Sequence, residues 1–182
     1  MKCLGEIYMI ELVWYDQYGN RVEGEGKKHY LAPLWVSSGA TQSGVSNDIY
    51  MQLKFEYPSL QNITNHSSNE THGAFIVSLP GIISHTNRQK MSYRIVIDAR
   101  DFPHHKPRAF VFIPCDEEIQ HCNIYHPKSF SVWPNKPLME ICEGEFDWES
   151  IPKDNLTRFA AWLNQILQVL SNPNPEDTAR SI

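Results

Sequence analysis

The stretch that decides the fold is residues 124–148, which read IYHPKSFSVWPNKPLMEICEGEFDW. It opens with Tyr-His-Pro and continues through a loop in which Pro134 and Pro137 restrict the backbone. A short apolar run then carries Cys142, and an acidic loop closed by Trp148 follows. A thiol between a proline-rich loop and a tryptophan-anchored turn suits a residue that a large partner must reach.

Three short apolar runs precede this stretch, and each is bounded by turn residues. They lie at residues 74–79, 93–97 and 108–113, and the last of them stops at Pro114. Runs of five or six β-forming residues separated by turns are typical of an antiparallel meander. We therefore expect an antiparallel sheet before Cys142.

Residues 49–57 form the candidate first strand of that sheet. Apolar side chains alternate with polar ones through Ile49, Met51, Leu53, Phe55 and Tyr57. This is the period of a half-buried strand. A helix is the alternative, because Ile49, Leu53 and Tyr57 are spaced four residues apart and Asn47-Asp48 can cap a helix. The alternation is complete, so it favours a strand and, with it, a four-stranded meander.

Residues 154–170 are predicted to be a helix. Asp154 or Asn155 can cap its N-terminus, and the Asn-Pro-Asn-Pro sequence from Asn172 ends it. Apolar side chains recur at spacings of three and four along one face: Leu156, Phe159, Leu163, Ile166, Leu167 and Leu170. The sequence thus predicts an α+β domain in which this helix packs near one end of the sheet.

The composition limits the classes of function. The 182 residues suit one domain with an extension, and 41% hydrophobic residues are ordinary for a folded chain. The net charge of −5 gives no electrostatic basis for binding nucleic acid. No apolar run is long enough to cross a membrane, and no cleavage signal follows the first ten residues. We therefore expect a cytoplasmic protein whose four cysteines are reduced.

Together, these segments resemble the ubiquitin-conjugating (E2) enzymes. In that family a His-Pro-Asn turn precedes a Leu/Ile-Cys-Leu run, and a tryptophan segment then leads into a helix that ends at an Asn-Pro-Asn-like turn. Here His126-Pro127, Ile141-Cys142, Trp148 and the turn at residues 172–175 take those places. Phe102-Pro103 is similar to the Tyr-Pro at which the family's preceding strand ends.

The resemblance covers about residues 47–180 and implies a fold and a domain division. Residues 47–182 would form a UBC-like domain, with a four-stranded antiparallel meander and the C-terminal helix packed against it. Residues 1–46 would be an N-terminal extension. A hairpin and a short helix both fit the pattern of that extension.

The resemblance also implies a catalytic site built on Cys142. This thiol would accept a ubiquitin-like C-terminus as a thioester and pass it to an amine. Asn135 lies seven residues earlier, where the family has its oxyanion-stabilising amide, although a turn-forming role before Lys136-Pro137 is equally open. His126 would orient the loop or act as a base, and a structural role in the His-Pro turn is favoured.

Acidic residues surround Cys142 in the sequence: Glu140, Glu143, Glu145 and Asp147. Negative charge disfavours a thiolate, which argues against a strongly activated cysteine of the protease type. It suits a carrier, because the incoming acyl group is already an activated thioester. No cofactor is implied.

The departures from the family pattern are similar to those of divergent bacterial E2-like proteins. Lys128 follows His-Pro where the family has Asn, sixteen residues separate His126 from Cys142, and residues 1–46 have no match. Such proteins are encoded in antiphage operons that carry a cGAS-like nucleotidyltransferase (CBASS). The implied partners are an E1-like activating enzyme and either a ubiquitin-like modifier or the nucleotidyltransferase.

Two other classes of function stay open. A non-catalytic E2 variant would dock a partner through its surface, with Cys142 incidental. A zinc-stabilised domain would draw its ligands from Cys115, His121, Cys122 and His126, which are of the right types although no Cys-x2-Cys pair is present.

Overall fold

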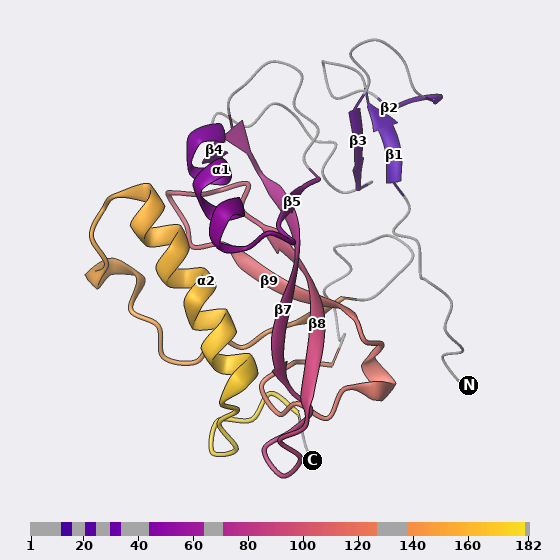
Figure 1. Ribbon diagram of the computed structural model, residues 1–182, viewed down its shortest axis with the longest axis vertical. Coiled ribbons are helices and arrows are strands. Elements are labelled where there is room, and N and C mark those ends of the chain that lie inside the picture. Colours follow the sequence, from indigo (N-terminus) through magenta and orange to yellow (C-terminus); the bar gives the residue numbers. More distant parts are fainter. Residues whose placement is uncertain are drawn as a thin grey trace.

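The computed structural model describes residues 12–15, 21–24, 30–33, 44–63, 71–126 and 138–180. This part of the chain is an α+β protein with a mostly antiparallel sheet and a C-terminal helix (Figure 1). Asn135 lies outside the described residues. Neither described helix combines the length and the apolar character that crossing a bilayer requires.

The main sheet has five strands in the order β10-β9-β8-β7-β5. Its three long strands are β7 (Ala74–Ile82), β8 (Lys90–Asp98) and β9 (Arg108–Ile113), and each is antiparallel to the next. Two-residue strands, β5 (Gln61–Asn62) and β10 (Met139–Glu140), form the edges. The antiparallel meander that the three apolar runs predict is confirmed.

The predicted strand over residues 49–57 is wrong, because Asn47–Glu56 form the helix α1. The hydroxyl of Ser46 accepts a hydrogen bond from the Ile49 backbone N–H at 3.4 Å and caps this helix. Leu53 is the one buried residue of α1, whereas Met51 is 57% and Phe55 89% exposed. The alternation of apolar and polar residues therefore does not reflect which side chains are buried. The outer strands of the sheet are β5 and β10 instead.

The helix α2 (Asn155–Ser171) confirms the prediction for residues 154–170. The Asp154 carboxylate accepts a hydrogen bond from the Thr157 N–H at 2.8 Å and caps its N-terminus. α2 covers one face of the sheet and contacts β7 most closely (Figure 1). At Gly81 of β7, a Cβ atom would lie 2.7 Å from the Leu170 carbonyl oxygen, so this close approach requires glycine.

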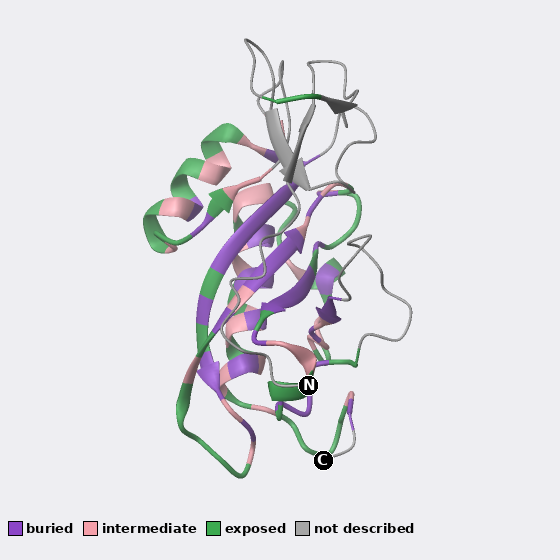
Figure 2. Cartoon of the chain, turned by 90° about the vertical axis from the view of Figure 1, so that its right-hand side faces the viewer, coloured by how far each residue is buried: buried purple, intermediate pink, exposed green. Residues whose placement is uncertain are grey.

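The main core lies between α2 and the sheet. Phe159, Trp162 and Leu163 of α2 are fully buried there, together with Phe75 and Ile95 of the sheet. Figure 2 shows buried residues along the strands and on the side of α2 that meets them. A smaller apolar cluster includes Ile76, Val96, Leu138 and the side chains of Phe110 and Phe112, which are buried as the meander requires.

The described part of residues 1–46 contains strands. β1 (Leu12–Tyr15) pairs with β2 (Arg21–Val22) and β3 (Tyr30–Pro33) in a separate antiparallel sheet. β4 (Val45–Ser46) pairs instead with β6 (Thr71–His72), and Val45 is fully buried in the main core. The last residues before α1 therefore belong to the main body of the protein.

Candidate active site

Cys142 follows β10 and faces a second short segment across an antiparallel pairing. Ile141 and Ile124 form a bridge between the two segments, and both side chains enter the main core. The Cys142 N–H donates to the Asn123 carbonyl at 2.8 Å, and the Tyr125 N–H donates to the Glu140 carbonyl at 2.9 Å. Successive side chains of a strand point to opposite faces. Asn123, Tyr125, Glu140 and Cys142 therefore share the face opposite to the core.

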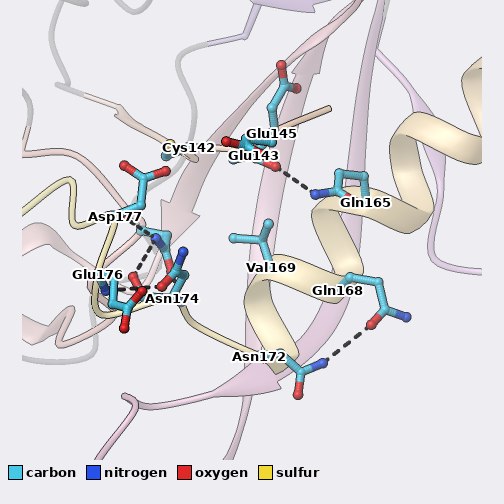
Figure 3. Close-up of a pocket in the computed structure, with 12 residues that line it drawn as sticks. Cys142, Glu143, Glu145, Gln165, Gln168, Val169, Asn172, Asn174, Glu176 and Asp177 are labelled. Carbon is cyan, nitrogen blue, oxygen red and sulfur yellow. Dashed lines mark hydrogen bonds between the residues drawn. The ribbon is translucent and has the colours of Figure 1, made fainter. Parts of the chain in front are cut away.

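The residue after the thiol anchors this segment to α2. The Glu143 carboxylate accepts a hydrogen bond from the Trp162 indole N–H at 2.9 Å and also pairs with Lys106. The Glu143 carbonyl accepts a further hydrogen bond from the Gln165 side chain at 2.7 Å, which Figure 3 shows. Three side chains, two from α2 and one from the loop before β9, thus hold Glu143 in place, while the thiol itself stays partly exposed.

Asn123 holds the segment after α2 against the strand that faces Cys142. Its amide N–H groups donate to the carbonyls of Asn174 at 3.2 Å and Asp177 at 2.7 Å, and its side-chain oxygen accepts from the Asn174 N–H at 2.8 Å. The side chain is buried and all its hydrogen-bonding groups are engaged. Asn123 therefore positions Glu176 and Asp177 beside the thiol.

His121 connects the same segment to the end of α2. Its Nε2 lies 3.3 Å from the Leu170 carbonyl, and its Nδ1 accepts from the Asn123 N–H at 3.3 Å. Burial lowers the pKa of His121, and hydrogen bonds to backbone oppose that effect. These contacts fit a neutral imidazole that donates through Nε2, so His121 supports the position of Asn123.

Two cavities meet at Cys142, and both include Glu143 and Gly144 in their walls. The first, the acidic cavity, has a volume of about 510 Å³ and lies between the Cys142 loop and the end of α2 (Figure 3). Its lining in the described chain includes no Lys or Arg, and its carboxylates favour a cationic ligand: Glu143, Glu145, Glu176 and Asp177.

The second cavity, which we call the Tyr125 cavity, has a volume of about 600 Å³. Its walls carry the cations Lys106 and Arg108, each of which is paired with a carboxylate. The Tyr125 ring also lines it. The pKa of Tyr125 is raised, first by the negative charge of a Cys142 thiolate and then by burial.

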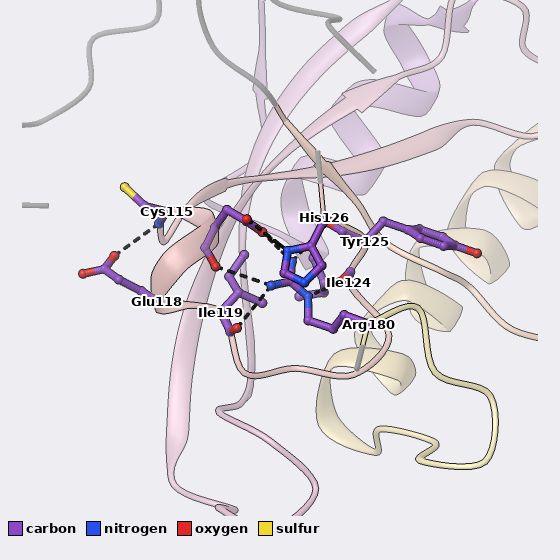
Figure 4. Close-up of polar contacts among 8 residues, drawn as sticks. Cys115, Glu118, Ile119, Ile124, Tyr125, His126 and Arg180 are labelled. Carbon is purple, nitrogen blue, oxygen red and sulfur yellow. Dashed lines mark hydrogen bonds and ion pairs between the residues drawn. The ribbon is translucent and has the colours of Figure 1, made fainter. Parts of the chain in front are cut away.

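His126 makes its described contacts with a different cluster. Its Nδ1 lies 3.1 Å from the Asp116 carboxylate, which also pairs with Arg180 at 2.7 Å. The buried Arg180 guanidinium donates to the carbonyls of Ile124 and Tyr125 and thereby holds this segment in place (Figure 4). Figure 4 shows the side chains of His126 and Tyr125 pointing apart. Tyr125, rather than His126, therefore lines a cavity together with Cys142.

The other cysteines have separate surroundings. Cys115 begins a short 3₁₀ helix, where its N–H donates to Glu118 at 3.2 Å. Cys122 is buried, burial raises the pKa of its thiol, and its Sγ contacts the side-chain oxygen of Asn123 at 3.4 Å. In the described part of the chain, no three His, Cys, Asp or Glu side chains gather in a group that could hold a metal ion.

The sequence interpretation missed Asn123, Tyr125 and the anchor at Glu143. The sequence contains a signal for Asn123, because His121 and Asn123 have the spacing of the His and the Asn in a His-Pro-Asn turn, and the apolar Ile124 follows them. The sequence shows Glu143 only as one of several acidic residues. Its contact with Trp162 joins positions 19 residues apart, and no local pattern predicts it. Comparisons with protein-family models, with curated proteins and with solved structures found no match.

Proposed function

We propose that this protein is an E2-like conjugating enzyme that carries a ubiquitin-like C-terminus as a thioester on Cys142 and transfers it to an amine. The observation that carries the proposal is a partly exposed thiol on an anchored segment, with a cavity on each side of it. A carrier needs this arrangement because a donor and an acceptor must both reach the same sulfur atom.

The chemistry needs two acyl transfers. In loading, the Cys142 thiolate attacks the donor's thioester carbonyl, a new C–S bond forms, and the old C–S bond breaks as the donor thiolate leaves and takes up a proton. In discharge, a neutral amine attacks the same carbonyl, the Cys142 thiolate leaves, and the amine loses a proton to solvent or to a nearby carboxylate. The acidic cavity supports the second step, since carboxylates attract an ammonium group to the thiol.

Asn123 takes the place of the family's asparagine better than Asn135 does. His121-Cys122-Asn123 keeps the His and the Asn of a His-Pro-Asn turn at the same spacing. Asn123 also faces Cys142 across the backbone pairing. Its amide is engaged with residues 174–177, so we assign it the role of positioning the residues that line the acidic cavity.

A UBC-like fold for residues 47–182 belongs to the same proposal, as does a place in a bacterial antiphage (CBASS) pathway.

The partners in this proposal are an E1-like activating enzyme and either a ubiquitin-like modifier or a cGAS-like nucleotidyltransferase.

The test of the proposed function is to express the tagged full chain from its own locus as wild type and as Cys142→Ser. The wild type should carry an adduct that thiol reagents remove. Cys142→Ser should carry the same mass as an oxyester that resists thiol reagents, and mass spectrometry of either adduct identifies the modifier.

Cys115→Ser is the matched control, because Cys115 is also a partly exposed thiol of the described chain. This variant should keep the thiol-sensitive adduct. An adduct that survives in Cys142→Ala but is lost in Cys115→Ser would contradict the proposal.

A further inference from the structure

Tyr125 and Cys142 lie on the same face of an antiparallel pairing and line the same cavity. The antiparallel register sets Tyr125 opposite Glu140 and Asn123 opposite Cys142. Tyr125 is thus the diagonal neighbour of Cys142 on the same face, a separation that an aromatic side chain can span. Both side chains line the Tyr125 cavity, and the negative charge of a Cys142 thiolate is the first cause of the raised pKa of Tyr125.

The backbone of Tyr125 is held from both sides. Its N–H donates to the Glu140 carbonyl at 2.9 Å, and its carbonyl accepts from the Arg180 guanidinium at 3.1 Å. Arg180 itself is buried, and its ion pair with Asp116 fixes it. Tyr125 is 41% exposed, so its side chain can be reached from solvent within the cavity.

Other described candidates for this role are engaged elsewhere. The Asn123 amide donates both of its N–H groups to the segment after α2. Lys106 pairs with Glu143 and Arg108 with Glu140, so both cations of the cavity are opposed by carboxylates. The raised pKa of Tyr125 keeps the phenol protonated near neutral pH, where it is a hydrogen-bond donor.

We propose that the Tyr125 hydroxyl is a catalytic hydrogen-bond donor to the Cys142 sulfur that stabilises the thiolate as it leaves during discharge. This role rests on the proposed function, because it assigns a residue to the second acyl transfer. The phenol keeps its proton throughout. As the C–S bond breaks, the bonding electron pair moves to sulfur, and the O–H group meets the growing negative charge.

The two half-reactions should respond differently to the loss of this hydroxyl. In discharge the donor stabilises the leaving group directly, and a hydrogen bond to a charged group is worth about tenfold in rate or more. In loading the donor increases the thiolate fraction but makes the thiolate less nucleophilic, so the effects partly cancel and the change is about threefold or less. A residue with a purely structural role would slow both steps together.

The first measurement needs no acyl donor. Alkylation of Cys142 by iodoacetamide is followed by peptide mass spectrometry across pH in the full-length wild type, in Tyr125→Phe, and in Tyr57→Phe as the control at the residue directly after α1. The charged and titratable groups that line the two cavities around the thiol are Lys106, Arg108, Tyr125, Glu140, Glu143, Glu145, Glu176 and Asp177. Tyr125→Phe removes the Tyr125 hydroxyl and leaves the other groups in place, so the pH midpoint of alkylation should rise in that variant alone. An unchanged midpoint overturns the inference.

The second measurement is single-turnover discharge. The Cys142 thioester is formed by exchange with a peptide thioester that ends in glycine, and it is then mixed with free lysine. Tyr125→Phe should discharge about tenfold more slowly than wild type and Tyr57→Phe. A wild-type discharge rate in Tyr125→Phe overturns the catalytic role, whereas failure of the wild type to load overturns the proposed function instead.

Discussion

Glu143 accepts a hydrogen bond from the Trp162 indole at 2.9 Å, directly after Cys142 in the chain. Trp162 is fully buried in α2, so its N–H group depends on this partner. The contact ties the loop that carries the thiol to the helix that covers the sheet. It explains how a polar, acidic loop can hold a cysteine in one place.

Glu143→Ala should destabilise the protein by about 1–3 kcal/mol, because the buried Trp162 N–H would lose its acceptor. Glu145→Ala is the matched control in the same loop, where the side chain is exposed, and it should change the stability little. Urea unfolding of the two variants gives the comparison. Equal unfolding midpoints would show that the indole contact does not stabilise the loop.

Leu163→Ala should lower the stability by about 2–5 kcal/mol, because it removes a fully buried side chain from the core beneath α2. Asn164→Ala, on the exposed side of the same turn, is its control. Thermal unfolding of both variants tests the orientation of the helix. If the melting temperature falls as much in Asn164→Ala as in Leu163→Ala, the face of α2 that packs against the sheet is not the one described here.

The long elements of the fold could be predicted from sequence, and α1 could not. The three β-forming runs and the 3–4 spacing of α2 each reflect burial over five residues or more, so one misleading position does not change the prediction. α1 buries one residue, Leu53, and its exposed Met51 and Phe55 complete an alternation that carries no packing information. The alternative of a capped helix was the correct one, with Ser46 rather than Asn47 or Asp48 as the cap.

The site could be predicted in part, because Cys142 lies on an anchored and partly exposed segment as its flanking sequence suggests. The neighbours of the thiol depend on strand register and on the return of the chain after α2. Neither can be read from spacing, which is why Asn123 and Tyr125 were missed. Asn135 lies outside the described residues, and its assigned role stays a prediction.

The titration of Tyr125 offers a test of the electrostatic influence that Cys142 has on it. The thiolate charge of Cys142 is the largest cause of the raised pKa of Tyr125, because negative charge opposes formation of a phenolate. Cys142→Ala removes that charge and should lower the pKa of Tyr125. The measurement is the ultraviolet titration of tyrosinate, taken as the difference from Tyr125→Phe in each background. Cys115→Ala should leave the pKa of Tyr125 unchanged, and an equal shift in that control would assign the effect to another cause.

His126→Ala should change the stability by less than about 1 kcal/mol, because its pair with Asp116 is partly exposed to solvent. Arg180→Met should cost more, since the buried guanidinium donates to several carbonyls of residues 116–125. Urea unfolding ranks the two variants. Should His126→Ala instead stop discharge of the Cys142 thioester while leaving the stability intact, His126 has the catalytic role that we propose for Tyr125.

The most direct test of the central claim is acyl transfer to the purified full chain. The protein is mixed with a peptide thioester that ends in glycine, and intact mass and peptide mapping locate any acyl group. The account predicts one acyl group on Cys142 that thiol reagents remove, no such adduct in Cys142→Ala, and wild-type loading in Cys115→Ser. Loading of Cys142 no faster in the folded protein than in the urea-unfolded chain would contradict it.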